Sequence, residues 1–499
     1  MTDIVIDDLD RERLAGTRGK AEQLAMRMLV AAAETSGAAE FVPIEFAHIG
    51  SCHYTGRLAL DYAEFLLAEG ATLAVPTHTN ASLIDIHQPA MRPEAATPEA
   101  VRGAARLMEI YETLGCTAMW SCAPYHEART RPTVGAQIVG SESNAVSFFN
   151  SVLGARTNKY GDLLDVCAAI IGKVPLAGLH TDEGRLATHE LRLELTDAEL
   201  ADSSLPHLLG IIMGRAVGTA VPVLTGLPSA TEDELKAIAA AAATSGAVEM
   251  FHVVGVTPEA PTFADATGGR TVEWVTVVDR KTLAEARTLL TTTDSERIDS
   301  VCLGTPHFSI DEFGALRSAL DGRHVHDAVR LVVTTSRAIA HELGLRGWRA
   351  ELDELGVEIV LDTCTYYPPQ PSGVRGTVMT NSAKWAYYAP GMLPIDVVFG
   401  GLQACADAAV TGQVGAPARA SPYAGFTANR SRGRSCASMN HLASGAASTP
   451  ARERSSIRPT PRPAHRWRAL SSPCPVRADR QALPGFSAKR SVPARGRRP

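Results

Sequence analysis

The sequence is poor in cysteine, and none of its cysteines form a CxxC pair. Nine cysteines in 499 residues are too few for a disulfide scaffold. There is no run of about 18 apolar residues, which excludes an ordinary transmembrane helix. The acidic start, MTDIVIDDLDRERLAG, lacks the basic and apolar segments of a signal peptide. We therefore expect a cytoplasmic protein with no membrane-spanning segment.

Lysine and acidic residues are scarce in the last part of the chain. From Ala416 onward there are 16 arginines and one lysine against Glu453 and Asp479, a charge of +15, while the rest of the chain carries −21. Such an asymmetry indicates two different kinds of polypeptide. We therefore divide the chain into a body, residues 1–414, and a tail, residues 415–499. The tail is rich in Arg, Pro, Ser and Ala without periodicity, so it is predicted to lack a packed fold.

The body alternates helical and strand patterns. Residues 97–115 and 231–246 each begin with Thr and early acidic residues, as helices do, and the first also has Pro at the first helical position. Residues 40–49, 71–77 and 248–256 read as short buried strands. This alternation predicts an α/β protein, in which loops at the carboxyl ends of parallel strands usually carry the chemistry.

Three cysteines stand in similar surroundings. Cys122 lies in MWSCAPYH, Cys302 in DSVCLGTPHFS and Cys364 in VLDTCTYYP. Each follows an apolar, strand-like run, so we expect all three at strand ends. Three thiolates placed in this way suit an iron–sulfur cluster with one open iron. The alternative, three unrelated buried thiols, is the commoner situation for cysteine.

Several polar loops could bind a small polyoxygenated anion. Glu142 can accept from an amine or hydroxyl, and Arg156 can hold a carboxylate with two hydrogen bonds. Other candidate side chains are Ser51, Asn80 and Lys384. Each loop could equally satisfy only its own turn. No phosphate-binding loop of the GxxxxGK[ST] or GxGxxG type follows a strand, which argues against a nucleotide site of those kinds.

Histidines near the predicted strand ends are a further group. A single histidine there is usually a hydrogen-bonded structural residue, and this is our interpretation of His252. His307 is the more interesting one because it follows Cys302 closely.

Six segments between about Gly50 and Val410 together resemble the large-subunit region of the aconitase X family. They are SCAPYH, GSESNAVSFFNSVLGARTNKYGD, GLHTDEGR, FHVVGVTPEA, LGTPHFS and TNSAKWAYYAPG. The resemblance implies three aconitase-like α/β domains around an iron–sulfur cluster, closed by a swivelling fourth domain. It implies a hydro-lyase acting on cis-3-hydroxy-L-proline, as in one branch of the family. The alternative is mevalonate 5-phosphate, as in the archaeal branch.

The resemblance also assigns roles to single residues. Cys122, Cys302 and Cys364 become cluster ligands, for a 2Fe-2S, 3Fe-4S or 4Fe-4S cluster alike. The chain departs from the archaeal pattern at Thr305, where that branch has its second cysteine directly before Pro-His. Cys302 is therefore the least secure of the three ligands, and the departure favours the hydroxyproline branch.

The remaining roles implied by the resemblance concern the substrate. Asn80, Glu142, Ser143 and Lys384 become substrate-site residues, to which Ser51 and Arg156 add from their own chemistry. The catalytic base is expected to be a serine on the swivelling domain. That domain is either fused to the body or supplied as a small partner subunit.

The tail offers a hypothesis about that fourth domain. One permitted back-translation of Arg477–Ser491, read in a shifted frame, encodes RGSSGSSGVLGEAI, which is similar to the family's swivelling-domain end, RGSSSSSGVLxEAI. We interpret the tail as a swivelling domain read out of frame, which would leave the chain without its base.

A non-catalytic alternative remains open. The chain could be an iron–sulfur protein that binds nucleic acid through its basic tail, with salt-dependent affinity. We do not favour nucleic acid as a partner, because a shifted frame accounts for the tail's composition. The favoured partner is a small hydroxy acid.

Overall fold

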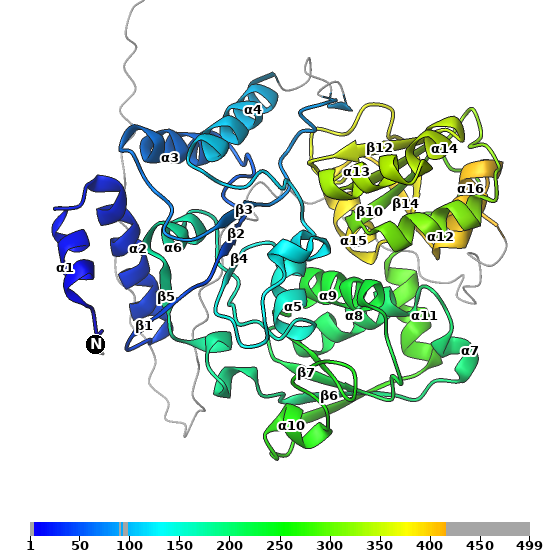
Figure 1. Cartoon of the computed structure of the whole chain (residues 1–499). Helices are drawn as coiled ribbons and strands as arrows, with labels where there is room; N and C mark the ends of the chain where they lie inside the picture. The colour runs from blue at the N-terminus through cyan, green and yellow to red at the C-terminus, as the bar shows by residue number, and fades with distance from the viewer. Residues whose placement is uncertain (1–3, 89–90, 93–97, 416–499) are drawn as a thin grey trace, which may run out of the picture. The chain divides into compact units, whose positions relative to one another are not determined.

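The computed structural model describes residues 4–88, 91–92 and 98–415, and these contain three parallel β-sheets that follow one another along the chain (Figure 1). This confirms the α/β prediction. The tail beyond Gly415 lies outside the described residues, so the interpretation of it stays a hypothesis. None of the described helices is long and apolar enough to cross a bilayer.

The first region of the chain is built around the small parallel sheet β3-β2-β4, with an antiparallel pair β1-β5 beside it. Its core is formed mainly by the apolar faces of α2, α3, α4 and α6. The elements are α1 (Asp8–Ala15), α2 (Lys20–Ser36), β1 (Phe41–Pro43), β2 (Ala47–Ile49), α3 (Arg57–Ala68), β3 (Thr77–Thr79), α4 (Pro98–Thr113), β4 (Val139–Gly140), α5 (Ser143–Ser151), α6 (Leu164–Ile171) and β5 (Lys173–Pro175).

The second region has a four-stranded parallel sheet of order β8-β7-β6-β9. Helices α8 and α9 pack closely because small residues face each other: a Cβ built on Gly214 would lie 2.2 Å from Ser245 Oγ. The elements are β6 (His189–Leu193), α7 (Asp197–Leu200), α8 (Leu205–Val217), β7 (Pro222–Thr225), α9 (Glu232–Gly246), β8 (His252–Val253), α10 (Phe263–Thr267), β9 (Trp274–Val278) and α11 (Arg280–Leu289).

The third region has a five-stranded parallel sheet of order β12-β11-β10-β13-β14, covered by helices on both faces (Figure 1). The elements are β10 (Ser300–Phe308), α12 (Ile310–Leu320), β11 (Arg330–Thr335), α13 (Arg337–Leu345), α14 (Trp348–Glu354), β12 (Val357–Leu361), β13 (Thr377–Thr380), α15 (Ala383–Met392), β14 (Asp396–Phe399) and α16 (Leu402–Thr411).

Side chains alternate between the two faces of this last sheet, as the strand period of two requires. Val301 and Leu303 point into the core formed with α12 and α16. Cys302, between them, belongs to the core on the opposite face, which includes residues of α8, α9 and α15. Each fully buried aliphatic side chain in these cores contributes about 1.5–3 kcal/mol.

The predicted helices are confirmed, whereas the predicted strands are shorter than expected or absent. Residues 40–49 contain β1 and β2, and residues 248–256 contain only β8. The helices expected over 97–115 and 231–246 are α4 and α9, and α9 begins with the capping box of Thr231 and Glu234. Residues 71–76 form no strand, and β3 begins only at Thr77. An apolar run of this length does not by itself distinguish a strand from a buried loop.

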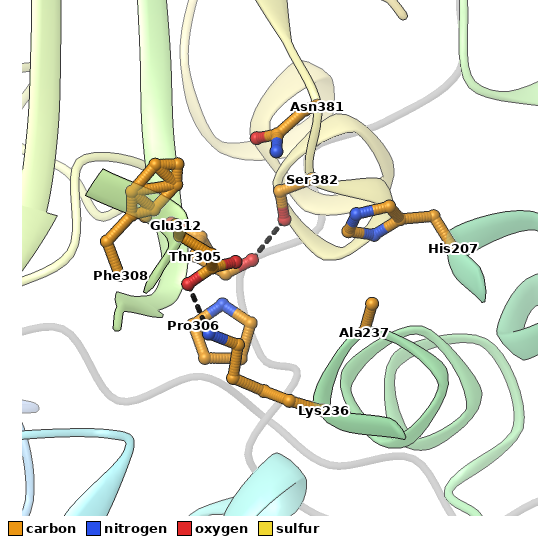
Figure 2. A pocket seen from close by; sticks show the side chains of 10 residues that line it. His207, Lys236, Ala237, Thr305, Pro306, Phe308, Glu312, Asn381 and Ser382 are labelled. Carbon is orange, nitrogen blue, oxygen red and sulfur yellow. Dashed lines mark hydrogen bonds and ion pairs between the residues drawn. The ribbon is translucent and has the colours of Figure 1, made fainter. Parts of the chain in front are cut away.

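A fully buried lysine joins the second and third regions. Lys236 of α9 is only 2% exposed, and its ammonium pairs with Asp233 Oδ1 at 2.8 Å and with Glu312 of α12 (Figure 2). Lys236 and Glu312 line a cavity of about 10 Å³, room for about one water molecule. Across this cavity the Ser382 hydroxyl donates to the carbonyl of Thr305 (Figure 2). The cavity therefore adjoins the segment that leads into His307.

Replacing this lysine should destabilise the body strongly. Lys236→Met leaves two carboxylates without their cation, which costs about 3–5 kcal/mol for a buried pair. The measurement is the free energy of unfolding in urea. The control is Lys281→Met on α11, where an 80% exposed side chain is paired loosely with Glu285 and little change is expected. Equal effects of the two substitutions would contradict a structural role for Lys236.

Candidate metal and substrate site

Two cysteines and one histidine converge at a buried point. The ligand atoms of Cys122, His307 and Cys364 all lie within 4.8 Å of one another, and the two Sγ atoms are 3.9 Å apart. Cys122 lies in the loop before the short 3-10 helix η2 (Pro124–His126), His307 near the end of β10, and Cys364 just after β12. Only Cys364 therefore follows a strand, and the prediction that Cys122 and Cys302 also do so is wrong.

A bulge in β10 brings His307 into this group. The register of β10 against β11 shifts between Leu303 and Phe308. Gly304 sits in the bulge with φ of +84°, and a Cβ there would lie 2.1 Å from the carbonyl oxygen of Thr334. Only glycine fits such a backbone. The bulge places the main-chain N–H of His307 3.3 Å from Cys122 Sγ, to which it donates.

Hydrogen bonds fix the tautomer of His307. Its Nε2 is 3.0 Å from the carbonyl oxygen of Thr363, which can only accept, so Nε2 carries the proton. Its Nδ1 is 3.1 Å from the hydroxyl of Ser121, and that hydroxyl also accepts from the N–H of Ala123. The Ser121 hydroxyl and Nδ1 therefore share a hydrogen bond, and the ring is held on both sides.

The two thiols differ in acidity. Burial alone would raise the pKa of Cys122, but the hydrogen bond from Cys364 and the nearby His307 lower it to about 6. The hydrogen bond to Cys122, together with burial, raises the pKa of Cys364. The pair therefore holds one thiolate and one thiol near neutral pH. Metal ions bind the thiolate form, and binding releases the remaining proton.

The spacing of these two thiols fits two ligands of one soft metal ion. Two thiolates on one tetrahedral metal ion, at about 2.3 Å each, lie about 3.8 Å apart. The observed Sγ–Sγ distance of 3.9 Å matches that separation without any rearrangement. Soft thiolate ligands favour iron–sulfur clusters, zinc and copper(I) over hard cations.

Cys302 is not a member of this close group in the ranges that the structure describes. It lies within β10, fully buried, with its Cα opposite that of Val332 on the neighbouring strand. Burial raises its pKa to about 12, although a hydrogen bond with Thr365 opposes the effect. It belongs to the same buried core as Cys122 and Cys364. Its role as a ligand stays a prediction.

The predicted substrate residues Glu142, Lys384 and Asn80 meet beside the metal group. Lys384 Nζ lies 2.5 Å from Glu142 Oε1, and Asn80 donates to Glu142 Oε2 at 3.2 Å. Ser143 lies 3.4 Å from the same carboxylate at the start of α5. Both charges of the ion pair are buried, at 8% and 3% exposure for Glu142 and Lys384.

Electrostatics hold this pair in its charged form. Burial would raise the pKa of Glu142, but Lys384 and the donors around the carboxylate lower it to about 2. Burial likewise opposes the charge of Lys384, but Glu142 keeps its pKa above the ordinary value. The same two charges act on the thiols of Cys122 and Cys364, which makes the two sites neighbours.

Ser51 forms hydrogen bonds with the carboxylate of Asp165, a residue that was not among the predicted site residues. Its hydroxyl donates to Asp165, its N–H donates to Asp165 Oδ2 at 3.1 Å, and its oxygen accepts from the N–H of Leu163 at 2.7 Å. Ser141 donates to the same carboxylate at 2.7 Å. Ser51 therefore shapes the loop after β2, and its contact with substrate stays a prediction.

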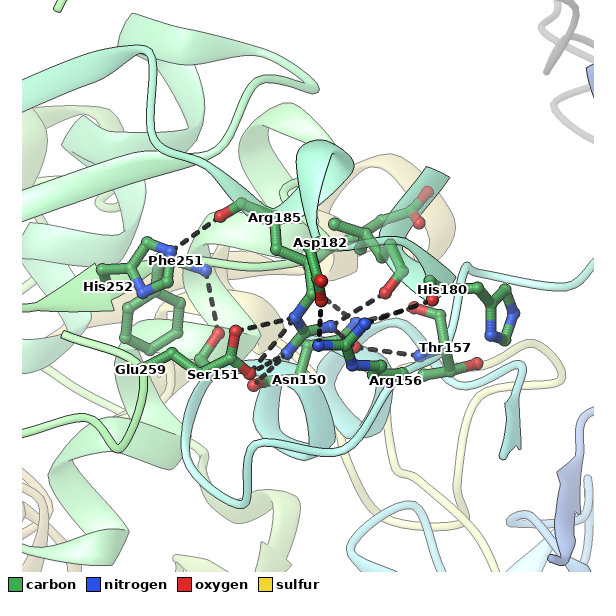
Figure 3. A network of polar contacts seen from close by, with 12 residues as sticks. Asn150, Ser151, Arg156, Thr157, His180, Asp182, Arg185, Phe251, His252 and Glu259 are labelled. Carbon is green, nitrogen blue, oxygen red and sulfur yellow. Dashed lines mark hydrogen bonds and ion pairs between the residues drawn. The ribbon is translucent and has the colours of Figure 1, made fainter. Parts of the chain in front are cut away.

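Arg156 lies in another polar network (Figure 3). Its guanidinium pairs with Asp182 and donates to the carbonyl of His180 at 3.4 Å. Beside it, the buried Arg185 pairs with Glu259 and holds Asn150 (Figure 3). The structure thus does not bring Arg156 to the Glu142–Lys384 pair, and its role in carboxylate binding stays a prediction.

Two further residues complete the carboxylate's surroundings. Asn144 donates to Glu142 Oε1 at 2.8 Å, and Tyr125 donates to the Asn144 amide oxygen at 2.9 Å. Both residues stand close in sequence to predicted site residues: Asn144 follows Glu142 by two positions, and Tyr125 follows Cys122 by three. No pattern of spacing, however, indicates that these two segments meet.

Models of one protein family match almost the whole body. The aconitase X first domain matches residues 3–183, the second domain 187–288 and the third domain 298–411. These limits coincide with the three regions described above, each with its own parallel sheet.

Individual relatives agree with the family models. The chain is 42% identical to cis-3-hydroxy-L-proline dehydratase of Pseudomonas aeruginosa over 416 residues, 82% of this chain and 70% of that protein. It is 36% identical to the phosphomevalonate dehydratase large subunit of Methanothermobacter thermautotrophicus, over 79% of this chain and 96% of that one. The solved structure of Thermococcus kodakaraensis aconitase X in its holo-form superposes with a TM-score of 0.73 at 28% identity, covering 81% of this chain and all of that one.

The two converging cysteines should be needed for metal retention. We expect Cys122→Ser and Cys364→Ser each to lose most of the iron bound after anaerobic reconstitution, because each removes a thiolate ligand. Iron and sulfide per folded chain are the measurement. The control is Cys405→Ser, a fully buried cysteine of α16 that should keep its iron.

The same series tests the sequence prediction for Cys302. Loss of iron in Cys302→Ser would establish it as a third ligand. Retention there, with loss in His307→Ala, would leave the imidazole as the third side chain of the site. Full retention in both Cys122→Ser and Cys364→Ser would contradict the site itself.

The Glu142 carboxylate should make stability depend on pH. Its pKa is lowered in the folded protein, so the unfolded chain binds more protons as pH falls from about 4.5 toward 2. Its contribution is present above pH 4.5 and is lost in that window. Glu142→Gln should therefore flatten the dependence of unfolding free energy on pH there. Glu34→Gln, exposed on α2, is the control, and an unchanged slope in Glu142→Gln would refute the assignment.

Proposed function

Because the chain belongs to the aconitase X family, we propose that it is a hydro-lyase that removes water from cis-3-hydroxy-L-proline. The reaction class follows from the family, since the relatives at 42% and 39% identity are dehydratases of this amino acid. The structural observation that carries the proposal is the buried Glu142–Lys384 pair beside the Cys122–His307–Cys364 group.

The charge of this pair suits an amino acid. Glu142 can accept from the ring ammonium through Oε2, which has one protein donor, Asn80. The ammonium of Lys384 uses one N–H on Glu142 and has others for a carboxylate. A zwitterion therefore finds one partner for each of its charges.

The cofactor we propose is an iron–sulfur cluster of the 2Fe-2S, 3Fe-4S or 4Fe-4S type. Cys122 and Cys364 would hold it, with His307 beside them and Cys302 as the thiolate predicted from the sequence. When bound, it would supply a Lewis acid that weakens the bond to the leaving hydroxyl.

The residues of this chain bind and orient the substrate. In the elimination, a base takes the proton on the carbon that bears the carboxylate. The 3-hydroxyl leaves as hydroxide and is protonated to water, so that one water is lost overall. The double bond that forms gives an enamine, which tautomerises to a pyrroline-2-carboxylate. Burial of Glu142 and Lys384 keeps bulk water from competing for the substrate's charges.

We propose that the base is a serine of a swivelling fourth domain. The hydroxyproline dehydratases extend beyond the aligned part, which covers 70% and 69% of their lengths. The out-of-frame reading of the tail would explain why residues 415–499 show no similar pattern. A small partner subunit could supply the same domain, and we keep a cytoplasmic location as part of the proposal.

A second candidate is the large subunit of a mevalonate 5-phosphate dehydratase. It is favoured by the share of each relative that aligns with this chain. That share is 96% of the Methanothermobacter large subunit but 70% of the Pseudomonas dehydratase. A phosphate monoester adds up to two negative charges, which Lys384 alone does not balance while it is paired with Glu142.

Turnover should require both the body and the restored frame. We expect anaerobically prepared protein whose frame is restored after Val414 to convert cis-3-hydroxy-L-proline to pyrroline-2-carboxylate, detected by chromatography. The chain as given should hold iron without turnover, because an out-of-frame tail would not supply the base. Glu142→Gln in the restored protein should lower activity by about 100-fold or more, since an uncompensated Lys384 disorders substrate binding.

Other outcomes separate the parts of this proposal. Turnover of mevalonate 5-phosphate instead would replace the substrate assignment and leave the reaction class. An intact reading frame in the coding DNA, with no swivelling-domain sequence in another frame, would refute the interpretation of the tail as an out-of-frame swivelling domain. Absence of iron from both proteins would refute the cofactor.

A further inference from the structure

Arg92 is a fully buried arginine that lies next to Cys364. Its side chain has 0% exposure, which places it among the largest fully buried side chains in the described part of the chain. It lies in the segment after β3, whereas its hydrogen-bond partners lie mostly after β12. It therefore connects the first region with the loop that carries one of the converging thiols.

Every N–H of the guanidinium is used. The Nε group donates to the carbonyl of Leu83 at 3.1 Å. One terminal nitrogen donates to the carbonyls of Tyr367 and Pro369, and the other to the carbonyl of Cys364 at 2.6 Å and to the hydroxyl of Thr363 at 3.3 Å. An arginine has five N–H groups, so none is left for a substrate.

The five acceptors are neutral oxygens. They satisfy the hydrogen bonds of the guanidinium, but they do not balance its positive charge. Burying an uncompensated charge costs several kcal/mol, and arginine does not escape that cost by losing its proton near neutral pH. Cys364, whose carbonyl Arg92 contacts, belongs to the converging Cys122–His307–Cys364 group.

The other deeply buried arginine of the body shows the usual arrangement. Arg185, 2% exposed, lies against the carboxylate of Glu259, to which its Nε donates at 2.8 Å (Figure 3). Arg92 has carbonyls where Arg185 has a carboxylate. The missing negative charge would be supplied by a thiolate-ligated iron–sulfur cluster, which carries net negative charge through its sulfides and thiolates.

The same bonds fix the position of Cys364. Arg92 contacts four residues in the short stretch Thr363–Pro369, including the carbonyl of Cys364 itself. Two more contacts dock this stretch on the first region: Ser82 N–H donates to the Asp362 carbonyl at 2.6 Å, and the Thr363 hydroxyl donates to Leu83 at 3.0 Å. The loop is thus shaped around the guanidinium.

We propose that Arg92 is a positioning residue for the metal group, which orients the Cys364 loop and supplies the buried positive charge that balances a thiolate-ligated cluster. This inference rests on the proposed cofactor. It makes Arg92 distinct from Lys384, whose charge is already balanced by Glu142 and which keeps N–H groups free for the substrate.

Two substitutions separate charge from position. Arg92→Lys keeps the charge but has three N–H groups for five acceptors, so it loosens the Cys364 loop. Arg92→Met removes the charge and all five donors. The matched controls are Arg185→Lys and Arg185→Met, at an equally buried arginine in the Asn150–Glu259 network.

The experiment reconstitutes the full chain and its variants anaerobically and measures three quantities. These are iron per folded chain, the rate of iron release to a chelator, and the reduction potential of the bound group. Arg92→Lys should release iron at least about tenfold faster, as loss of a supporting contact does at metal sites. Arg92→Met should release it faster still and shift the potential to lower values, because a nearby positive charge favours the reduced cluster.

The controls and the wild-type chain separate the possible failures. Arg185 variants should lower the melting temperature while leaving iron release and potential per folded chain unchanged. If the Arg92 variants match the wild type in release rate and potential while all hold iron, the inference is overturned and the cofactor proposal stands. A wild-type chain that holds no iron overturns both. If Arg92→Met does not fold, Arg92→Lys still decides.

Discussion

Lys384 and Glu142 lie 242 residues apart in the sequence and form an ion pair where neither charge reaches bulk water. Two buried charges are tolerated only when each compensates the other and the remaining hydrogen-bonding capacity is filled. Asn80 and Asn144 fill part of it on the carboxylate, and Oε2 keeps room for a further donor. Bringing these groups together requires that the first and third regions dock closely, and the same docking brings Cys122 to Cys364, also 242 residues apart.

Buried charges hold the other junctions of the body as well. Lys236 joins α9 to the start of α12, a few residues beyond His307, and Arg92 joins the segment after β3 to the Cys364 loop. Because the metal site is built from segments of different regions, the positions of its ligands depend on these junctions. Arg92 and Lys384 therefore lie close to the converging thiols, whereas the equally buried Arg185 lies in the Asn150–Glu259 network.

Much of this was accessible from the sequence. The amphipathic pattern and Thr-Glu start of α9 predicted its bounds, and the order of the family motifs predicted the three-region body. Glu142, Lys384, Asn80, Cys122 and Cys364 were named from local chemistry and resemblance. Their convergence depends on the tertiary structure, which the spacing of these residues in the sequence does not predict.

The arrangements that the sequence did not reveal have physical causes. Cys302 lies within β10, and the bulge at Gly304 brings His307 to Cys122, which a strand pattern does not reveal. Arg156 has the right chemistry for a carboxylate, but a nearby acid, Asp182, engages it. Arg92 stood out in no motif, because its partners are main-chain carbonyls, and these carry no side-chain signature in a sequence.

The most direct test of the account is X-ray absorption spectroscopy at the iron edge of the reconstituted chain. We expect sulfur neighbours at about 2.3 Å, the length of a metal–thiolate bond, and loss of the sulfur signal together with the iron in Cys122→Ser. A first coordination sphere of oxygen and nitrogen alone, unchanged by that substitution, would contradict it.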